Sequence, residues 1–485
     1  MASGIAKIQN GERMSLREQI ALAVKLSLPA ILAQLSSILM QYIDASMVGR
    51  LGAESSASVG LVSSSLWLFW GVCSMITMGF SVQVAHRIGA KQYADARSVL
   101  RQGITACFIA GIVIMAIGLA IAPFLPHWLG GEDAICPDAT LYFSVFIIAL
   151  PVLTMNYLAG GMLRCAGNMK VPSLLNVMMC VLDVIFNFFL IFPTRDISLP
   201  GFSITMPGAG LGVLGAALGT VAAECVTAAM MMWFLCVKQD GLNIAKFKFA
   251  RRSFRPTRSV LKRATNIALP MTVEHVVFCG AQIMIMVIVA PLGIVAIAAN
   301  AFAVTAESLC YMPGFGIGDA ATTLTGQSYG AGRIDLVKRF CHISVILGMA
   351  IMTIMAAVMY VCAPVMMDIM TPVSAISSLG TEVLRIEAWA EPMYAASIVA
   401  YGAFVGVGDT LLPAIMNFGS IWLVRIPVAA FLAPVMGLRG VWIAMCVELI
   451  FRGSIFLWRM VGGYWYRNAK KTTDSEVPLP EEDLE

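Results

Sequence analysis

Residues 19–44, "QIALAVKLSLPAILAQLSSILMQYID", decide the class of fold. Between Ile20 and Ile43 the only charge is Lys25, so the run can cross a bilayer as one helix, which takes about 20 residues. The run ends on a carboxylate, Asp44, and an acid at the centre of a membrane helix costs roughly 2.5–3.5 kcal/mol on insertion scales. The stretch predicts a membrane protein and, in Asp44, an acid that needs a functional explanation.

The rest of the chain has the same character. Of the 485 residues 59% are hydrophobic and 12% are charged, whereas soluble domains have about 25% charged residues, and the mean hydropathy is +0.83. The sequence therefore predicts an all-α integral membrane protein. Twelve transmembrane helices are expected, at roughly 19–44, 55–80, 98–123, 137–162, 171–192, 209–236, 264–290, 295–320, 340–363, 378–404, 411–433 and 438–462.

The basic residues are distributed asymmetrically between the two sides. With both termini placed inside, 27 of the 32 Lys and Arg residues fall on the inward side, as the positive-inside rule requires. A cytoplasmic linker at 237–263 alone holds nine of them, a composition that favours contact with anionic lipid headgroups. We therefore expect a multi-pass protein of the cell (plasma or inner) membrane, with a cytoplasmic tail at 1–18 and an acidic, disordered cytoplasmic tail at 466–485.

The two halves of the chain repeat one design. Shifted by 241 positions, the sequence matches itself without a gap over some 150 residues. The pairs include Pro29 with Pro270, Gly89 with Gly330, Pro151 with Pro392, Gly167 with Gly408, and Asn176 with Asn417. Six spans per copy make the halves parallel repeats, an arrangement found in secondary transporters that hold substrate between them. We predict an N-lobe at 19–236 and a C-lobe at 264–465 around a central cavity.

Six segments in this order resemble the multidrug and toxic compound extrusion (MATE) family. They are "DASMVGRLGAESSASVGL" (44–61), "HRIGAKQ" (86–92), "GMLRCAGN" (161–168), "GVLGAALGT" (212–220), "MPGFGIGDAATTLTGQSYGAG" (312–332) and "GAFVGVGDT" (402–410). The resemblance extends over roughly residues 19–460. It implies two six-helix lobes around a cavity, and an antiporter that exports organic, often cationic compounds against inward flow of Na+ or H+, with no cofactor besides that ion.

Three spans of the first half carry candidate coupling residues. Asp44 lies where MATE family members carry an acid on the first helix; the alternative is an acid solvated beyond the helix end. Asp183 and Asn187 share a helical face and offer oxygens that suit a hard cation, although an interhelical clamp is the alternative. Family members often have the reverse order, Asn-x-x-x-Asp. Thr220 falls where the family often has threonine, but could equally bond its own helix backbone. These four residues are predicted to hold a proton or Na+.

The second half is richer in acids. Glu274 on the seventh span, Glu307 on the eighth and Glu391 on the tenth are predicted to line the substrate cavity or to serve coupling in the second lobe. The resemblance implies acids on the seventh and tenth helices, although Glu274 and Glu391 are out of register with the usual positions. Glu387 lies near the outer end of its span, where water would solvate it. Arg425 needs a counter-charge, which one of these acids could supply.

Other classes of protein fit the sequence less well. A flippase for lipid-linked oligosaccharides is the alternative of related fold, but its cavity should be basic to hold a pyrophosphate, and here the spans are acidic. A membrane-embedded enzyme would need clustered histidines or metal ligands, and the four histidines are scattered. A major-facilitator carrier would have a basic loop signature that "AHRIGAKQYADAR" lacks. We expect organic small molecules and membrane lipids as partners, no nucleic acid, and a monomer.

Overall fold

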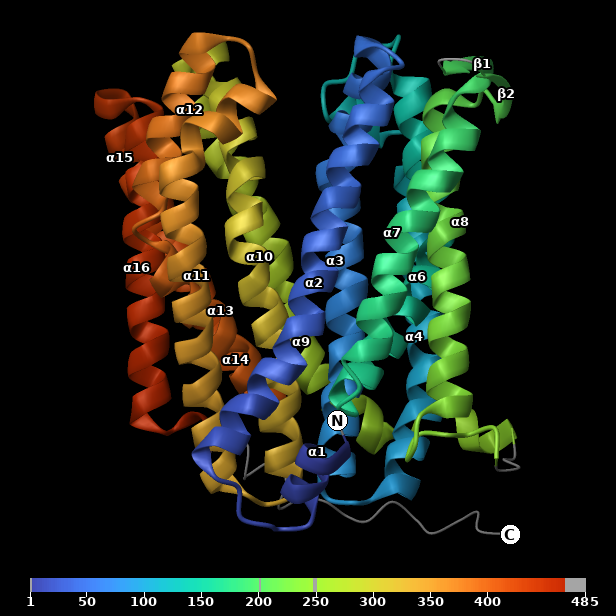
Figure 1. Cartoon of the computed structure of the whole chain (residues 1–485), viewed down its shortest axis with the longest axis vertical. Coiled ribbons are helices and arrows are strands. Elements are labelled where there is room, and N and C mark those ends of the chain that lie inside the picture. Colours follow the sequence, from blue (N-terminus) through green and yellow to red (C-terminus); the bar gives the residue numbers. More distant parts are fainter. Residues whose placement is uncertain (1, 200–201, 247–250, 467–485) are drawn as a thin grey trace.

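The computed structural model describes residues 2–199, 202–246 and 251–466. Most of them form long helices that run along the longest axis of the molecule (Figure 1). Within this part of the chain, eleven helices are long and apolar enough to cross a membrane. The predicted linker at 237–263 is described except for 247–250. The predicted tail at 466–485 lies outside the described residues, apart from Tyr466.

The N-lobe contains six long helices joined by short connections. They are α2 (Leu16–Gly49), α3 (Ala53–Gly89), α4 (Tyr93–Ile121), α6 (Cys136–Cys165), α7 (Lys170–Ile191) and α8 (Gly212–Trp233), with the short α5 (Leu125–Trp128) before α6. Between α7 and α8, β1 (Pro193–Leu199) and β2 (Phe202–Ala209) form an antiparallel hairpin. The sequence predicted only a loop there, so the hairpin is an addition to an otherwise helical fold.

The C-lobe repeats this arrangement, but its tenth predicted span is divided into two helices and its eleventh contains a π-helical turn. Its helices are α9 (Arg258–Val289), α10 (Ile294–Gly330), α11 (Ile334–Met370), α12 (Ser374–Glu387), α13 (Glu391–Gly406), α14 (Leu411–Ser420), α15 (Ile426–Met436) and α16 (Leu438–Gly462). A π-helical turn, η4 (Ile421–Arg425), joins α14 to α15 without a break, and a similar turn, η1 (Phe234–Lys238), extends α8. Single turns of 3₁₀-helix, η2 (Arg251–Phe254) and η3 (Ala290–Leu292), flank α9.

The tenth predicted span is not one helix. In place of a continuous helix over 378–404, α12 and α13 are separated by residues 388–390. Pro392 lies in the first turn of α13, where its missing N–H is not needed, whereas its repeat partner Pro151 lies inside the unbroken α6. The break leaves Glu387 at the end of α12 and Glu391 at the start of α13. Glu387 is 0% exposed, so the prediction that water solvates it is wrong.

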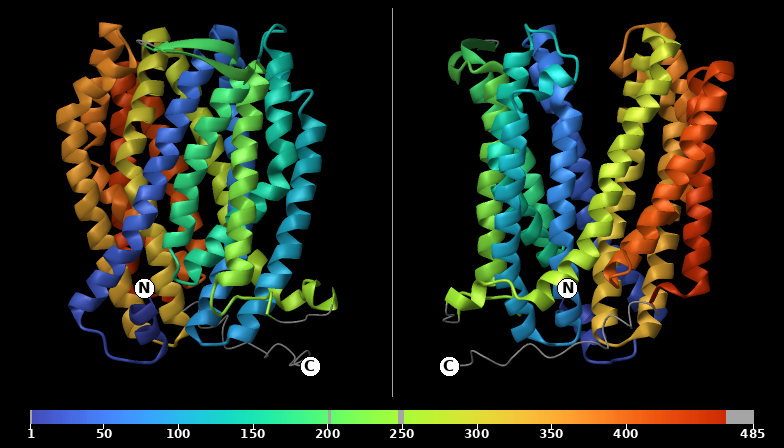
Figure 2. Two further views of the ribbon diagram at one scale, coloured as in Figure 1. Left: turned by 45° about the vertical axis from the view of Figure 1, so that its right-hand side comes forward. Right: turned by 180° about the vertical axis from the view of Figure 1, so that it is seen from behind.

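The helices gather into two groups that correspond to the two halves of the sequence (Figures 1 and 2). The groups diverge toward the end that carries α12 and the β1–β2 hairpin, and they converge toward the end that carries α1 (Ala2–Gln9). Each group has its own hydrophobic core, around Phe143 in the N-lobe and Trp442 in the C-lobe. The two lobes therefore have hydrophobic cores of their own and come together toward the end that carries α1.

The first residues of the chain form a helix where the sequence suggested only a polar tail. Ile5 and Ile8 of α1 are buried, Ile8 completely, in a cluster with Met169 of the N-lobe and with Leu324 and Phe340 of the C-lobe. A capping box, in which Ser15 and Glu18 bond reciprocally, then starts α2. The α1 helix thus packs beneath both lobes at the end where they converge.

Candidate functional site

The candidate cation residues of the N-lobe come together where α2, α7 and α8 meet. The side-chain amide of Asn187 donates to Asp44 Oδ1 at 2.9 Å and to Asp183 Oδ2 at 3.2 Å. The two carboxylates are also near enough for their charges to interact. Asp183 and Asn187 are 0% and 1% exposed, and Asp44 is half-buried. One carboxamide therefore holds two acids from different helices in a single cluster.

A glycine on α8 makes room for this cluster. A Cβ atom at Gly219 would overlap the side-chain oxygen of Asn187, so only glycine lets α8 approach α7 this closely. The next residue, Thr220, lies near the Asp183 carboxylate, while its hydroxyl donates to the Ala216 carbonyl at 3.2 Å. Both interpretations of Thr220 thus have a counterpart in the structure: a local backbone bond and a position beside the acid.

A further polar pair extends the cluster along α8. Asn156 of α6 donates to Glu224 Oε2 at 2.7 Å, and Glu224 is close enough to Asp183 for their charges to interact. Asn156 is not among the site residues predicted from the sequence. Its signal was a lone carboxamide within the apolar run of α6, the same kind of residue as Asn187 in α7.

The oxygens of the cluster are not all satisfied by the protein. Asp183 Oδ1 and Asn187 Oδ1 are buried and make no hydrogen bond to any described residue. Buried acceptors normally find a partner, because leaving one unpaired costs about 1–3 kcal/mol. The set contains only oxygen donors, which fit a proton or a hard cation such as Na+ rather than a transition metal. Among the described residues, no group of three or more His, Cys, Asp and Glu is arranged to hold a metal.

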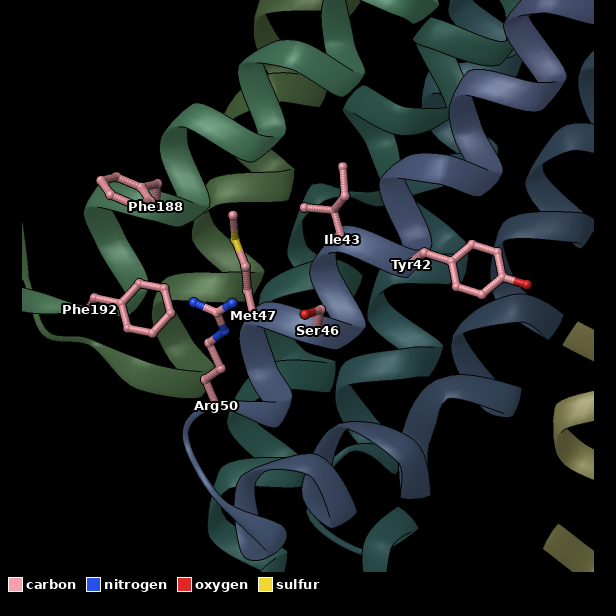
Figure 3. Close-up of a pocket in the computed structure, with 7 residues that line it drawn as sticks. All are labelled: Tyr42, Ile43, Ser46, Met47, Arg50, Phe188 and Phe192. Carbon is pink, nitrogen blue, oxygen red and sulfur yellow. The ribbon is translucent and has the colours of Figure 1, made fainter. Parts of the chain in front are cut away.

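A pocket of about 330 Å³ lies one turn from this cluster, toward the β1–β2 hairpin. It is lined by Tyr42, Ile43, Ser46, Met47, Arg50, Phe188 and Phe192 (Figure 3). Arg50 points between Met47 and Phe192, whereas Tyr42 points away, and its hydroxyl donates to the Thr305 carbonyl of α10 at 2.9 Å. Ile43 and Phe188 are chain neighbours of Asp44 and Asn187. The pocket is therefore an aromatic recess directly beside the acids.

In the C-lobe, Glu274 forms a separate polar junction. Its carboxylate accepts hydrogen bonds from the Tyr401 hydroxyl at 2.7 Å and from the Asn417 side-chain amide at 2.5 Å. These bonds connect α9 with α13 and α14. Glu274 is half-buried, and Arg452 of α16 is near enough to interact with its charge. The junction fixes the orientation of the carboxylate, while part of the residue stays accessible.

The counter-charge of Arg425 comes from Glu448, which is not among the acids predicted from the sequence. Glu448 of α16 lies 3.3 Å from Arg425 and accepts two hydrogen bonds from Arg452, at 2.8 and 2.9 Å. Glu448 is 0% exposed. The prediction that one of the second-lobe acids named above forms the ion pair with Arg425 is therefore wrong: that ion pair is made by Glu448. Glu448 could not be recognised from the sequence, because Glu448 and Arg452 have the i,i+4 spacing of an ordinary ion pair on a helix surface.

The remaining second-lobe acids form a buried trio around the break in the tenth segment. Glu307 of α10 lies close enough to Glu387 and Glu391 for their charges to interact, and Arg425 is within reach of Glu307. Both carboxylate oxygens of Glu387 and of Glu391 are buried without a hydrogen bond to a described N or O group. The Cys310 thiol, a weak donor, lies beside Glu391. The structure thus groups Glu307 with Glu391, adds Glu387, and keeps Glu274 apart.

Around this trio, the charges of the described residues do not balance. Four buried acids, Glu307, Glu387, Glu391 and Glu448, face two buried arginines, Arg425 and Arg452. Isolated charges are costly to keep in a low-dielectric interior, so protons or another cation would stabilise such a site. Both lobes therefore contain a cluster whose chemistry suits the binding of positive charge.

Comparison with known proteins places the chain among membrane transporters. The family model described as MatE matches residues 29–189 and 270–431, one match in each lobe. The probable multidrug resistance protein NorM of Thermotoga maritima is 25% identical over 453 residues, which cover 93% of this chain and 94% of that protein.

Two solved structures share the fold. One is described as the outward-facing conformation of a multidrug resistance MATE family transporter, with a TM-score of 0.84, 21% identity and coverage of 98% of this chain and 99% of that one. The other, a transporter from Pyrococcus furiosus, has a TM-score of 0.84, 21% identity and coverage of 97% and 99%; its description infers a different function from a binding pocket of reversed polarity.

Proposed function

Because the chain belongs to the MatE family of membrane transporters, we propose that it is a secondary antiporter that exports organic, often cationic compounds in exchange for Na+ or H+. It is a multi-pass membrane transporter and not an enzyme. We further propose that it resides in the cell (plasma or inner) membrane with both termini in the cytoplasm. It would act there as a monomer, in contact with lipids and with no nucleic-acid partner.

The Asp44–Asn187–Asp183 cluster is the single observation that carries this proposal. Coupled export needs a cation site that one lobe can load from outside and release inside. The cluster supplies two acids, a carboxamide and two buried unpaired oxygens, and one of its acids, Asp44, is only half-buried. The ion would be held by Asp44, Asp183, Asn187 and Thr220. Its positive charge would balance the negative charges of the two acids.

A hydrophobic, adaptable route for substrate would run between the lobes. Glu274, Glu307 and Glu391 are proposed to draw cationic substrates to the C-lobe or to take part in coupling there, because a carboxylate in a low-dielectric surrounding attracts a cation over a longer range than one in water. Under this proposal the same property lets one lobe hold the coupling ion while the other holds the drug.

The flippase alternative is disfavoured by the state of the arginines. A pyrophosphate site would need uncompensated basic residues, and Arg425 and Arg452 are both engaged by Glu448. The described clusters of both lobes are otherwise acidic. These contacts favour a site for positive rather than negative cargo.

The deciding experiment is drug efflux in inside-out vesicles, with Na+ and proton gradients imposed separately. Uptake of a fluorescent organic cation that depends on one gradient and collapses with the matching ionophore would support antiport and identify the ion. Uptake that ignores both gradients would contradict coupled antiport, and movement of a lipid-linked sugar in the same vesicles would favour the flippase.

A further inference from the structure

The helix ends nearest α1 cross in close contact, and the crossing has two-fold symmetry. A Cβ atom at Gly89 of α3 would overlap the Gln327 carbonyl of α10, and a Cβ atom at Gly330 of α10 would overlap the His86 carbonyl of α3. Gly89 and Gly330 are equivalent positions of the repeat, 241 apart, and so are His86 and Gln327. The two copies of the repeat therefore close this end by contacting each other through the same backbone surface.

The same symmetry extends to a pair of side-chain hydrogen bonds that cross between the lobes. His86 Nε2 lies 2.8 Å from the Gly406 carbonyl oxygen at the end of α13, and Gln327 Nε2 donates to the Cys165 carbonyl oxygen at the end of α6, at 2.7 Å. Cys165 and Gly406 are again 241 positions apart. His86 and Gln327 are both buried. The contact between the lobes at this end, called the closure below, thus has two equivalent hydrogen bonds, called its arms. One arm is His86 with Gly406 and the other is Gln327 with Cys165.

The contacts of His86 fix its protonation. The Gly406 carbonyl can only accept, so Nε2 must carry a hydrogen, and Arg263 Nη2, a permanent donor 3.1 Å from Nδ1, requires that nitrogen to accept. Only the neutral tautomer satisfies both partners. The other groups facing the ring are the Arg87 guanidinium and the Tyr329 ring, whose centroid is 5.0 Å away. A second proton would turn an N–H toward Arg263 and place a cation beside two others.

The position of His86 lets water reach it when this end opens. The α3 helix has 37 residues, far more than the roughly 20 that a bilayer needs, and His86 lies in its last turn, beyond the predicted span at 55–80. Gln327 occupies the matching place on α10 but has no group that titrates. The two arms therefore differ in one property, their response to protons.

Resting on the proposed alternating transport, we propose that His86 is a proton-sensitive latch of the cytoplasmic closure and that Gln327 is its pH-independent counterpart. A neutral His86 bonds the lobes together at the cytoplasmic end. A protonated His86, formed when that end is open, keeps the lobes from closing. An imidazole in water titrates near pH 6.5, so below about that pH each unit of acidification lowers the closed-to-open ratio by about tenfold.

The latch can be tested without measuring transport. Cys165 carries the carbonyl that Gln327 bonds, is only 3% exposed, and has its thiol near Asp319 of the opposite lobe, so under the proposal a maleimide reaches this thiol when the cytoplasmic end opens. All twelve cysteines are free, so peptide mass spectrometry must follow Cys165 itself. The His86→Gln variant is the matched control, because it copies the other arm and has the same intrinsic thiol chemistry at each pH.

The measured quantity is the ratio of the Cys165 labelling rate in the wild type to that in His86→Gln at the same pH. We expect this ratio to be near one at pH 7.5 and about ten at pH 5.5. Gln327→His should give a steeper rise than the wild type, because it adds a second titrating arm, and this variant keeps the test decisive if His86→Gln folds poorly. Equal pH profiles for wild type, His86→Gln and Gln327→His would overturn the proposal. Loss of gradient-driven efflux with these profiles intact would instead reject the antiporter function and leave the latch.

Discussion

Asn187 reaches across from α7 to bond Asp44 on α2, at 2.9 Å, while bonding Asp183 on its own helix at 3.2 Å. The carboxamide is thus the element that joins two acids into one site. An Asn at this position can donate to both acids only while both keep unprotonated oxygens facing it. A proton or ion held on the two oxygens that face Asn187 would therefore compete with its amide for them and weaken the connection between α2 and α7.

We predict that Asp44→Asn abolishes coupled export while the protein still reaches the membrane. The substitution removes the accessible acid of the cluster and replaces an acceptor for Asn187 with a group that also carries donors. The measurement is efflux of a cationic dye from cells with matched membrane levels. Asp133→Asn, at a fully exposed side chain, is the control and should transport normally. Wild-type efflux by Asp44→Asn would contradict the assignment.

The order of the α7 pair gives a second prediction. Asp183→Asn should be inactive, because no acid remains on that face, and the double variant Asp183→Asn with Asn187→Asp should recover part of the activity. The two positions lie one turn apart on one face, so either can present the carboxylate. Efflux is compared among wild type, both single variants and the swap. Normal transport by Asp183→Asn, or a swap as inactive as that variant, would show that Asp183 has a structural role.

Gly219 provides a test of the close approach of α8. Gly219→Ala should reduce efflux strongly, because the added methyl group displaces the Asn187 side chain from the two acids. Gly60→Ala is the matched control, since a Cβ atom there meets nothing within 4 Å. Both variants are assayed for membrane level and for dye efflux. Equal activity of the two variants would mean that Asn187 need not keep its position.

A fourth prediction concerns the stability of the C-lobe. Glu448→Gln leaves Arg425 and Arg452 buried without their shared carboxylate, and breaking such a buried pair costs about 3–5 kcal/mol. The variant should unfold at a clearly lower temperature in detergent. Glu382→Gln removes the partner of Arg439 at an exposed site and should cost at most about 1 kcal/mol. Similar unfolding temperatures for both variants would argue against a structural role for the Glu448 pairing.

The second-lobe acids are predicted to determine substrate charge preference. Glu274→Gln and Glu391→Gln should weaken export of cationic substrates far more than export of neutral ones, because the attraction they supply acts on charge. Inhibition constants for matched cationic and neutral compounds provide the comparison. An equal loss for both kinds of substrate would assign these residues to coupling or folding.

Much of this architecture could be predicted from sequence, because hydropathy and the repeat both act over long stretches. The sequence predicted that Asp44, Asp183 and Asn187 share a site, and the structure brings them into hydrogen-bonding contact; their binding of a cation stays a prediction. The break between α12 and α13 could not be foreseen, since Pro151 and Pro392 occupy the same repeat position and only the second begins a helix.

Other features depended on contacts between distant segments. The burial of Glu387 follows from that unforeseen break, and the pairing of Glu448 with Arg425 depends on how α16 packs against η4. The α1 helix could not be predicted, because its two buried isoleucines lie in a polar stretch that is too short to show a helical period of hydrophobic residues. In each case the local sequence was compatible with solvent exposure, and tertiary packing decided otherwise.

The packing of α1 also constrains how the protein is made. The cluster around Ile5 and Ile8 joins early and late parts of the chain: it includes Leu22 and Met169, and also Leu324, Leu336 and Phe340 of α10 and α11, more than 300 residues further along. During synthesis the two isoleucines can pack against Leu22 and Met169 first, and the cluster is completed only after α10 and α11 are made. The α1 cluster is therefore completed late in maturation, when the second lobe comes to lie against the first.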